Sequence, residues 1–426
     1  MNLKKTYTSF KLILQKNRVL RRCIRLFTFI TCVAFLAPFL ANDKPLICKY
    51  KGQLLFPAFS YKNHVFIDNE SINYLMGKDW QTLKTEFSIF PPCSYSPNTI
   101  DADNAPRKGP FDNQIMNLKN GESIPLPIKF RHWLGTTQNG NDVLSCLIHG
   151  IKISLGVGIF SMLIAALLGI TLGAAAGYFQ NTGLKIGYIQ MVFLIISIFF
   201  NYFLCFVIRA EKLSDGFQSG GIWLFYQIGF TLYLWIQNTI IFLWLGKWID
   251  EKFDFNNRLH FPIDTIVLRI IEILNSIPTL LLIIALSAIT KPSFSLLIVI
   301  IGFLSWTGIA RITRAEYLKA KQLDYVTSCK AIGMGHYRII ARHILPNVLP
   351  LILVPVVFGL AGAVLIEASL SFIGVGVPLD VITWGSLLNE AREHFSAWWL
   401  VLFPGLCVFT LIFIYNKIAV EISKFK

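Results

Sequence analysis

The sequence predicts an all-α polytopic membrane protein, and three observations support that prediction. The chain of 426 residues is 54% hydrophobic and only 15% charged, which is too apolar for a soluble protein of this size. Apolar stretches long enough to cross a bilayer recur along the chain, about eight in all. The net charge of +15 comes from basic segments that flank these stretches, which is a positive-inside pattern and not a nucleic-acid footprint.

The amino-terminal part divides into a basic tail, a first span and a long polar segment. Residues 1–25 hold eight Lys/Arg and no acid, so we expect them in the cytoplasm. Residues 26–41 form a short first span, and their basic-apolar-Ala pattern also suits a cleaved signal peptide. Either alternative leaves the orientation downstream unchanged. Residues 42–150 balance eleven basic against ten acidic residues, and we expect them outside the membrane as a turn-rich segment, large enough for a small cap.

The sequence lacks the patterns that indicate an enzyme or a metal site. Its eight cysteines are scattered without a Cys-x-x-Cys pair, and its seven histidines include no zinc-protease motif. P-loop, nucleophile-elbow and paired-carboxylate patterns are also absent, so we expect no catalytic residue, no metal and no cofactor on this chain. Cys48 and Cys93 could pair in an oxidising external compartment or remain free.

The second span, residues 151–177, carries a stripe of small residues. They recur every four positions and are Ala165, Gly169, Gly173 and Gly177. This spacing places them on one face of a helix, which lets another helix approach closely. The neighbour is either a helix of the same chain or one of a partner subunit, and the sequence leaves both alternatives open.

Residues 186–246 hold two further aromatic-rich spans, Ile186–Ile208 and Ile222–Leu245, joined by a polar loop. With two spans the chain crosses the membrane and returns to the same side, so the orientation of the later spans is preserved. We expect a peripheral hairpin, whose role the sequence does not specify.

Residues 262–415 form the transmembrane core, and residues 416–426 a cytoplasmic tail. The core spans are predicted at Ile266–Ile289, Phe294–Ala310, Val348–Phe372 and Trp398–Tyr415.

Two residues of this core are candidates for a translocation path. Pro278 should kink its span, and kinks recur where transport helices line a path. Glu367 is a carboxylate near the end of a span, which makes it a functional candidate. A solvated helix end or an ion pair with a partner chain would also explain Glu367. Arg269 and Glu272, three residues apart, should pair.

The loop 311–346, between the sixth and seventh spans, organises the rest of the prediction. Seven Lys/Arg against two acids place it in the cytoplasm. A first short helix presents one apolar face, formed by Tyr325, Val326, Cys329 and Ile332. Gly333 stops that helix, and a second helix, Tyr337–Ile344, should close near Pro346. The apolar face is buried either by the loop itself or by a groove on another protein.

This loop resembles the coupling loop of ABC-importer permeases, which reads Glu-Ala-Ala, three residues, Gly, nine residues, Ile-x-Leu-Pro. Gly333 and Leu345-Pro346 match that spacing, whereas Thr327-Ser328-Cys329 replace Glu-Ala-Ala and His343 replaces Ile. The small residues still permit close docking, but the charge at the Glu position is lost. The resemblance implies contact with an ATPase by Asp324, Tyr325, Val326, Thr327, Ser328, Cys329, Ile332, Gly333, Leu345 and Pro346.

Other segments resemble the oligopeptide/dipeptide branch of these permeases. They are His132–Leu144, Ser276–Leu280, Glu367–Gly374 and Trp384-Gly385. Thr137 and Asn141 depart from the Asp and Arg of that branch. Residues 40–46 and 90–100 resemble the microcin C/peptide importer subset.

The resemblance implies a type I ABC-importer transmembrane domain in a bacterial inner membrane, with two spans more than the usual six. It implies a second permease, two ATPase subunits that bind ATP, and an external binding protein as partners, with peptides or similar small solutes as cargo. The main alternative is a secondary transporter driven by an ion gradient. An intramembrane enzyme is a further alternative, which the lack of a catalytic pattern opposes. The spans hold almost none of the buried charges that a secondary transporter needs.

Overall fold

The computed structural model describes residues 17–424 except 51, 60–79, 82, 84, 118–122, 220, 254–257, 290–291, 377 and 379–380. The chain forms two compact units. Unit 1 comprises residues 1–156, 364–374 and 379–417, and unit 2 comprises residues 157–363, 375–378 and 418–426. The predicted basic tail lies mostly outside the described residues.

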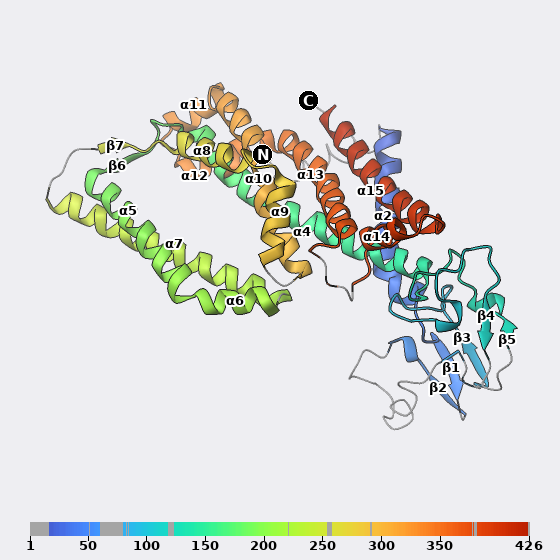
Figure 1. Cartoon of the computed structure of the whole chain (residues 1–426). Coiled ribbons are helices and arrows are strands. Elements are labelled where there is room, and N and C mark those ends of the chain that lie inside the picture. The colour runs from blue at the N-terminus through green and yellow to red at the C-terminus, as the bar shows by residue number, and fades with distance from the viewer. Residues whose placement is uncertain are drawn as a thin grey trace. The chain divides into compact units, whose positions relative to one another are not determined.

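The polar segment of unit 1 contains small antiparallel sheets where the sequence indicated mainly turns. One sheet has the order β2-β1-β3, and a second pairs β4 with β5 (Figure 1). Their bounds are β1 Ile47–Tyr50, β2 Gln53–Leu55, β3 Phe87–Ile89, β4 Ile115–Asn117 and β5 Ser123–Pro125. Short 3-10 turns accompany them at η1 Pro57–Phe59, η2 Ala102–Asn104 and η3 Ile128–Phe130. The strands are too short for a period of two to stand out in the sequence.

Cys48 and Cys93 are both free thiols in the structure. Cys48 packs with Leu55 and Trp80, whereas Cys93 belongs to a different cluster with Ala41 and Tyr95. The structure therefore has no Cys48–Cys93 disulfide.

The helices of unit 1 begin with α2, Arg18–Leu40, which starts eight residues before the predicted Leu26. The side chain of Asn17 accepts hydrogen bonds from the first backbone N–H groups and so caps the helix. The helices α14, Trp384–Glu393, and α15, Trp399–Ser423, complete the carboxyl-terminal part. Phe27 of α2 contacts Tyr415 of α15 at a ring-centroid distance of 5.6 Å.

The small-residue stripe packs within the chain. It lies on α4, Val143–Phe179, and faces α10, Phe294–Ala320. A Cβ added at Gly173 would lie 2.6 Å from the carbonyl oxygen of Ala310, and one at Gly169 would lie 2.8 Å from Ile309. The close approach confirms a neighbour within this chain and leaves no room there for a partner helix.

Residues 186–246 form a hairpin of α5, Tyr188–Tyr202, and α7, Gly221–Lys252, which run side by side (Figure 1). A π-helical turn, η4 Phe203–Ile208, and α6, Ala210–Ser219, connect them, and the strands β6 Lys185–Gly187 and β7 Arg258–His260 pair at the base. The side-chain N–H of Asn201 on α5 donates to the hydroxyl of Thr239 on α7 at 3.0 Å, which joins the two helices of the hairpin. Most of the large aromatic and aliphatic side chains on its outer face are exposed, as on a helix pair that faces lipid.

The predicted fifth span is broken at Pro278. Helix α8, Ile263–Asn275, and helix α9, Thr279–Ile289, meet at a bend of 76°. The remaining elements are α11 Asp324–Ala331, α12 His336–Arg338, η5 Ile339–Ile344 and α13 Leu345–Ile373. Seven helices of the described residues are long and apolar enough to cross a membrane, and the bent pair makes eight. The fold is therefore the predicted polytopic helical one.

Candidate functional site

Helix α11 lies in the loop between α10 and α13, and its carboxyl end is closed by Gly333. This glycine has φ +73°, a left-handed conformation that costs a glycine little. The amide of Met334 donates to the carbonyl of Cys329 at 3.1 Å, and that of Gly333 to Lys330 at 2.9 Å. This pair of bonds is a Schellman motif. Gly333 therefore fixes the direction in which the chain leaves α11, as the sequence predicted.

The predicted apolar face of α11 divides between the interior and the surface. Val326 is fully buried, and Tyr325 and Cys329 are half-buried. Ile332 is 74% exposed and Leu323 52% exposed. The loop itself covers one side of the helix, so the side that is free to meet another protein is formed by Leu323, Thr327, Ser328 and Ile332. Asp324 at its start is also exposed.

Tyr178, at the end of α4, connects this loop to the small-residue helix. Its hydroxyl lies 2.9 Å from Nδ1 of His336, the first residue of α12. The ammonium of Lys330 on α11 lies 5.6 Å from the centre of the Tyr178 ring, and that of Lys321 lies 6.0 Å away. Tyr178 is only 3% exposed. Tyr178 therefore contacts both α11 and α12 from the end of α4.

The second helix of the loop does not close at Pro346, contrary to the expectation. It continues without interruption from His336 through the π-helical turn η5 into α13, over 38 residues. Pro346 has no N–H to donate, and it is accommodated where the π-helical turn η5, which ends at Ile344, already interrupts the regular α-helical hydrogen bonds. Leu345 and Pro346 are thus half-buried residues at the start of a span.

Helix α8, on the amino-terminal side of the bend at Pro278, is joined to α10 by an ion pair near its start. Arg314 forms a bidentate ion pair with Asp264 of α8, with Nη2 to Oδ2 at 2.7 Å. Pro278 itself is exposed. The expected pair of Arg269 and Glu272 is present at 2.7 Å.

Glu367 lies in the interior of unit 1 with 0% exposure. Its carboxylate accepts hydrogen bonds from Ser154 of α4 at 3.2 Å and from Ser371 of α13 at 3.0 Å. Beside it, Trp384 packs against Gly150, and its indole N–H donates to the carbonyl of Leu147 at 3.0 Å. The side chain of Glu367 therefore joins α4 and α13. Because it is fully buried, it is not exposed to solvent at a helix end, and it does not line an open path in this structure.

A buried network in the polar segment was not evident from the sequence. His132 is fully buried, and its ring nitrogens lie 2.9 Å from Asp142 and 3.0 Å from Asp101. Asp142 also accepts from the amide of Ser145 at 2.8 Å, at the start of α4. Burial lowers the pKa of His132, but hydrogen bonds to the two carboxylates outweigh it, and the pKa is raised. Asp101 lies 31 residues before His132, so only the fold brings them together.

Comparisons with known proteins agree with this geometry. Residues 254–422 match the family described as the binding-protein-dependent transport system inner membrane component. The matched region contains α10, α11 and α13 with the Schellman turn. This chain is an ABC-importer permease. It is a multi-pass protein of the inner membrane and not a secondary transporter.

Similar permeases occur in several bacteria. A peptidoglycan transport system permease protein of Agrobacterium fabrum is 26% identical over 88% of this chain and 80% of its own length. An inner membrane ABC transporter permease of Escherichia coli is 24% identical over 85% of this chain and 79% of its own length. A putative peptide transport system permease of Brucella suis is 36% identical, but the match spans 44% of this permease and 63% of the relative.

Proposed function

We propose that this permease forms, with a second related permease, the path by which peptides or similar small solutes enter the cell. ATP is bound and hydrolysed on two separate ATPase subunits, and an external binding protein delivers the cargo. The amino and carboxyl termini and α11 lie in the cytoplasm. The peptide cargo is supported by the names of the relatives, which include peptide, dipeptide and glutathione transport permeases.

The observation that carries this proposal is the exposed side of α11. Ile332 and Leu323 are large apolar side chains at the surface of a loop that is otherwise basic. A groove on a closing ATPase dimer would bury them and displace α11. The Schellman turn at Gly333 keeps α11 at a fixed angle, and Tyr178 transfers the displacement to α4. A rigid connection of this kind couples ATP binding to rearrangement of the spans.

Docking on α11 predicts that a charge on its exposed side removes the ATPase. Ile332→Asp should lower the amount of ATPase that co-purifies with the permease by about tenfold or more, since a buried interface residue is lost and a charge is desolvated. The amount of permease in the membrane should not change. Co-purification from native membranes measures both quantities.

The matched control is Ile128→Asp, because Ile128 is 75% exposed and lies in the polar segment of unit 1. It should leave ATPase association intact. Undiminished co-purification of the ATPase with the Ile332 variant would refute the proposed docking surface.

A further inference from the structure

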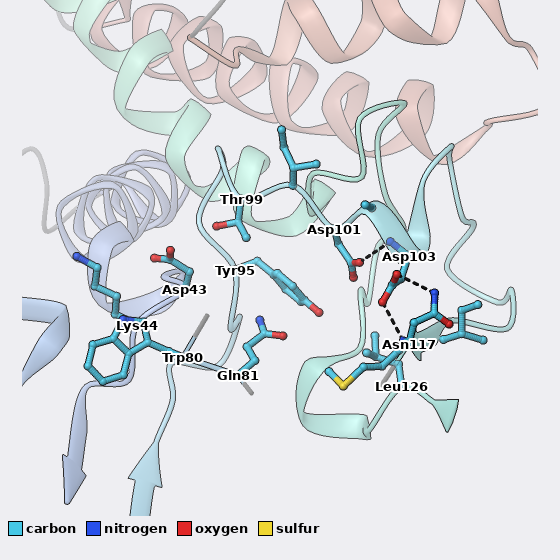
Figure 2. Close-up of a pocket in the computed structure, with 14 residues that line it drawn as sticks. Asp43, Lys44, Trp80, Gln81, Tyr95, Thr99, Asp101, Asp103, Asn117 and Leu126 are labelled. Atoms are coloured by element: carbon cyan, nitrogen blue, oxygen red, sulfur yellow. Dashed lines mark hydrogen bonds between the residues drawn. The ribbon is translucent and has the colours of Figure 1, made fainter. Parts of the chain in front are cut away.

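The polar segment of unit 1 contains a pocket of about 550 Å³, which is within the size range of sites for small molecules. It is separate from the coupling loop. Figure 2 shows Lys44 and Trp80 on one side, Asp103 and Asn117 on the other, and Tyr95 and Gln81 between them.

The two sides of the pocket carry opposite charges. Lys44 provides an ammonium that has no ion pair or side-chain hydrogen bond among the described residues. On the opposite side, both oxygens of Asp103 accept 2.9 Å hydrogen bonds from the backbone and side-chain amides of Asn117. These neutral donors fix the carboxylate without neutralising it. A ligand that satisfies both sides carries a negative and a positive group.

The remaining carboxylates determine which charge the pocket prefers. Asp101 is paired with His132 at 3.0 Å, so its charge is compensated. Asp43 lies on the side of Lys44, and no salt bridge or hydrogen bond of its carboxylate occurs among the described residues. The pocket therefore has two uncompensated carboxylates, Asp43 and Asp103, against the single ammonium of Lys44. This excess of negative charge disfavours a ligand with a net negative charge.

The pocket is also preorganised and partly apolar. Gln81 donates to the carbonyl of Ser94 at 3.0 Å, and the Tyr95 ring stacks on His132 with a centroid distance of 4.1 Å. Such fixed walls lower the entropic cost of binding. Ile115, Met116 and Leu126 also line the pocket and offer apolar surface to a ligand side chain.

We propose that this pocket binds a short zwitterionic peptide, with its terminal ammonium at Asp103 and its terminal carboxylate at Lys44. The inference rests on the proposed function, because it assigns a second, external contact of the permease to the same class of cargo. A peptide satisfies both charges through its termini, independently of its side chains, and the apolar wall accepts an aliphatic residue. Asp101 connects the pocket through His132 to Asp142 at the start of α4.

The test compares three forms of tri-alanine on the complete permease in nanodiscs, without ATPase subunits or nucleotide. The forms have free termini, an acetylated amino terminus or an amidated carboxyl terminus. Calorimetry should show that the free form binds about tenfold more tightly than either capped form, the loss expected for one charge-assisted contact. Equal affinity for the three forms, or no binding of any, would overturn the inference without the use of a variant.

Two variants test which terminus of the bound peptide contacts Lys44 and which contacts Asp103. Lys44→Met should remove the preference for the free carboxyl terminus and keep that for the free amino terminus, and Asp103→Asn should do the reverse. Lys49→Met and Glu86→Gln are matched controls, since this exposed ion pair at 3.2 Å does not line the pocket. Controls that change the affinity as much as the pocket variants would count against the assignment.

A further measurement separates this inference from the proposed function. ATP-dependent uptake of tri-alanine by the assembled importer, with no tri-alanine binding to the permease alone, would refute the pocket and leave the function intact. If the pocket variants instead weaken only the association of the external binding protein, the pocket is a protein-docking surface and the inference is wrong.

Discussion

At the scale of single residues, Tyr178 makes the most informative set of contacts. Its position at the end of α4 is unremarkable in the sequence, yet the structure surrounds it with His336, Lys321 and Lys330. Because these residues come from three successive parts of the loop, one side chain holds the loop together and joins it to a span.

This arrangement predicts partial uncoupling when Tyr178 is changed. Tyr178→Phe removes the hydrogen bond to His336 and keeps the ring, so solute transported per ATP hydrolysed should fall about two- to tenfold, as expected for one hydrogen bond. Tyr178→Ala should have a larger effect. Proteoliposomes that contain the assembled importer allow both rates to be measured.

Tyr188→Ala is the control, because Tyr188 is 57% exposed at the start of the hairpin. It should leave the ratio unchanged. An unchanged ratio in both Tyr178 variants, with the ATPase still bound, would show that Tyr178 has no part in coupling.

At the scale of elements, the contact between α4 and α10 fixes the core of unit 2. Gly302 of α10 approaches α4 in the same way that Gly169 and Gly173 of α4 approach α10, since a Cβ added at Gly302 would lie 2.8 Å from the carbonyl of Ser161. Glycines on both helices therefore set the distance between the two axes.

A methyl group at this contact should destabilise the permease. Gly173→Ala places Cβ 2.6 Å from a backbone carbonyl, and overpacking of this kind costs about 1–3 kcal/mol. The midpoint of thermal unfolding in detergent should fall by several degrees, on the order expected for such a loss.

Gly308→Ala is the matched control on α10, since its added Cβ meets nothing within 4 Å. Its midpoint should stay the same or rise slightly, because alanine favours a helix. Equal midpoints for the two variants would contradict close packing of α4 on α10.

At the scale of the whole molecule, the spans and the charge pattern together give an orientation. The basic loop 311–346 and the tail 416–426 should face the cytoplasm, and the polar segment 42–150 the opposite side. The bent pair α8–α9 counts as one of eight spans in this arrangement.

Epitope tags test this orientation. A tag inserted after Asn113, an exposed residue of the polar segment, should be reached by antibody on intact spheroplasts. A tag after Lys426 should be reached only after permeabilisation. Labelling of the carboxyl-terminal tag in intact spheroplasts would reverse the proposed topology.

The sequence by itself determined the spans, the basic loop and the turn at Gly333. Each depends on local composition or on the freedom of one backbone unit, so a short window of residues suffices. The kink at Pro278 belongs to this group, although its size of 76° required the structure.

Only the tertiary structure decided which side chains are exposed at the surface and which are buried in hydrogen-bond networks. Periodicity placed Val326 and Ile332 on one face, but the loop covers the first and exposes the second. Glu367 and His132 each have one hydrogen-bond partner far away in the chain, Ser154 at 213 residues and Asp101 at 31 residues, so the sequence alone could not show these networks. Burial and hydrogen bonding depend on segments that the fold brings together, and no local pattern records which segments those are.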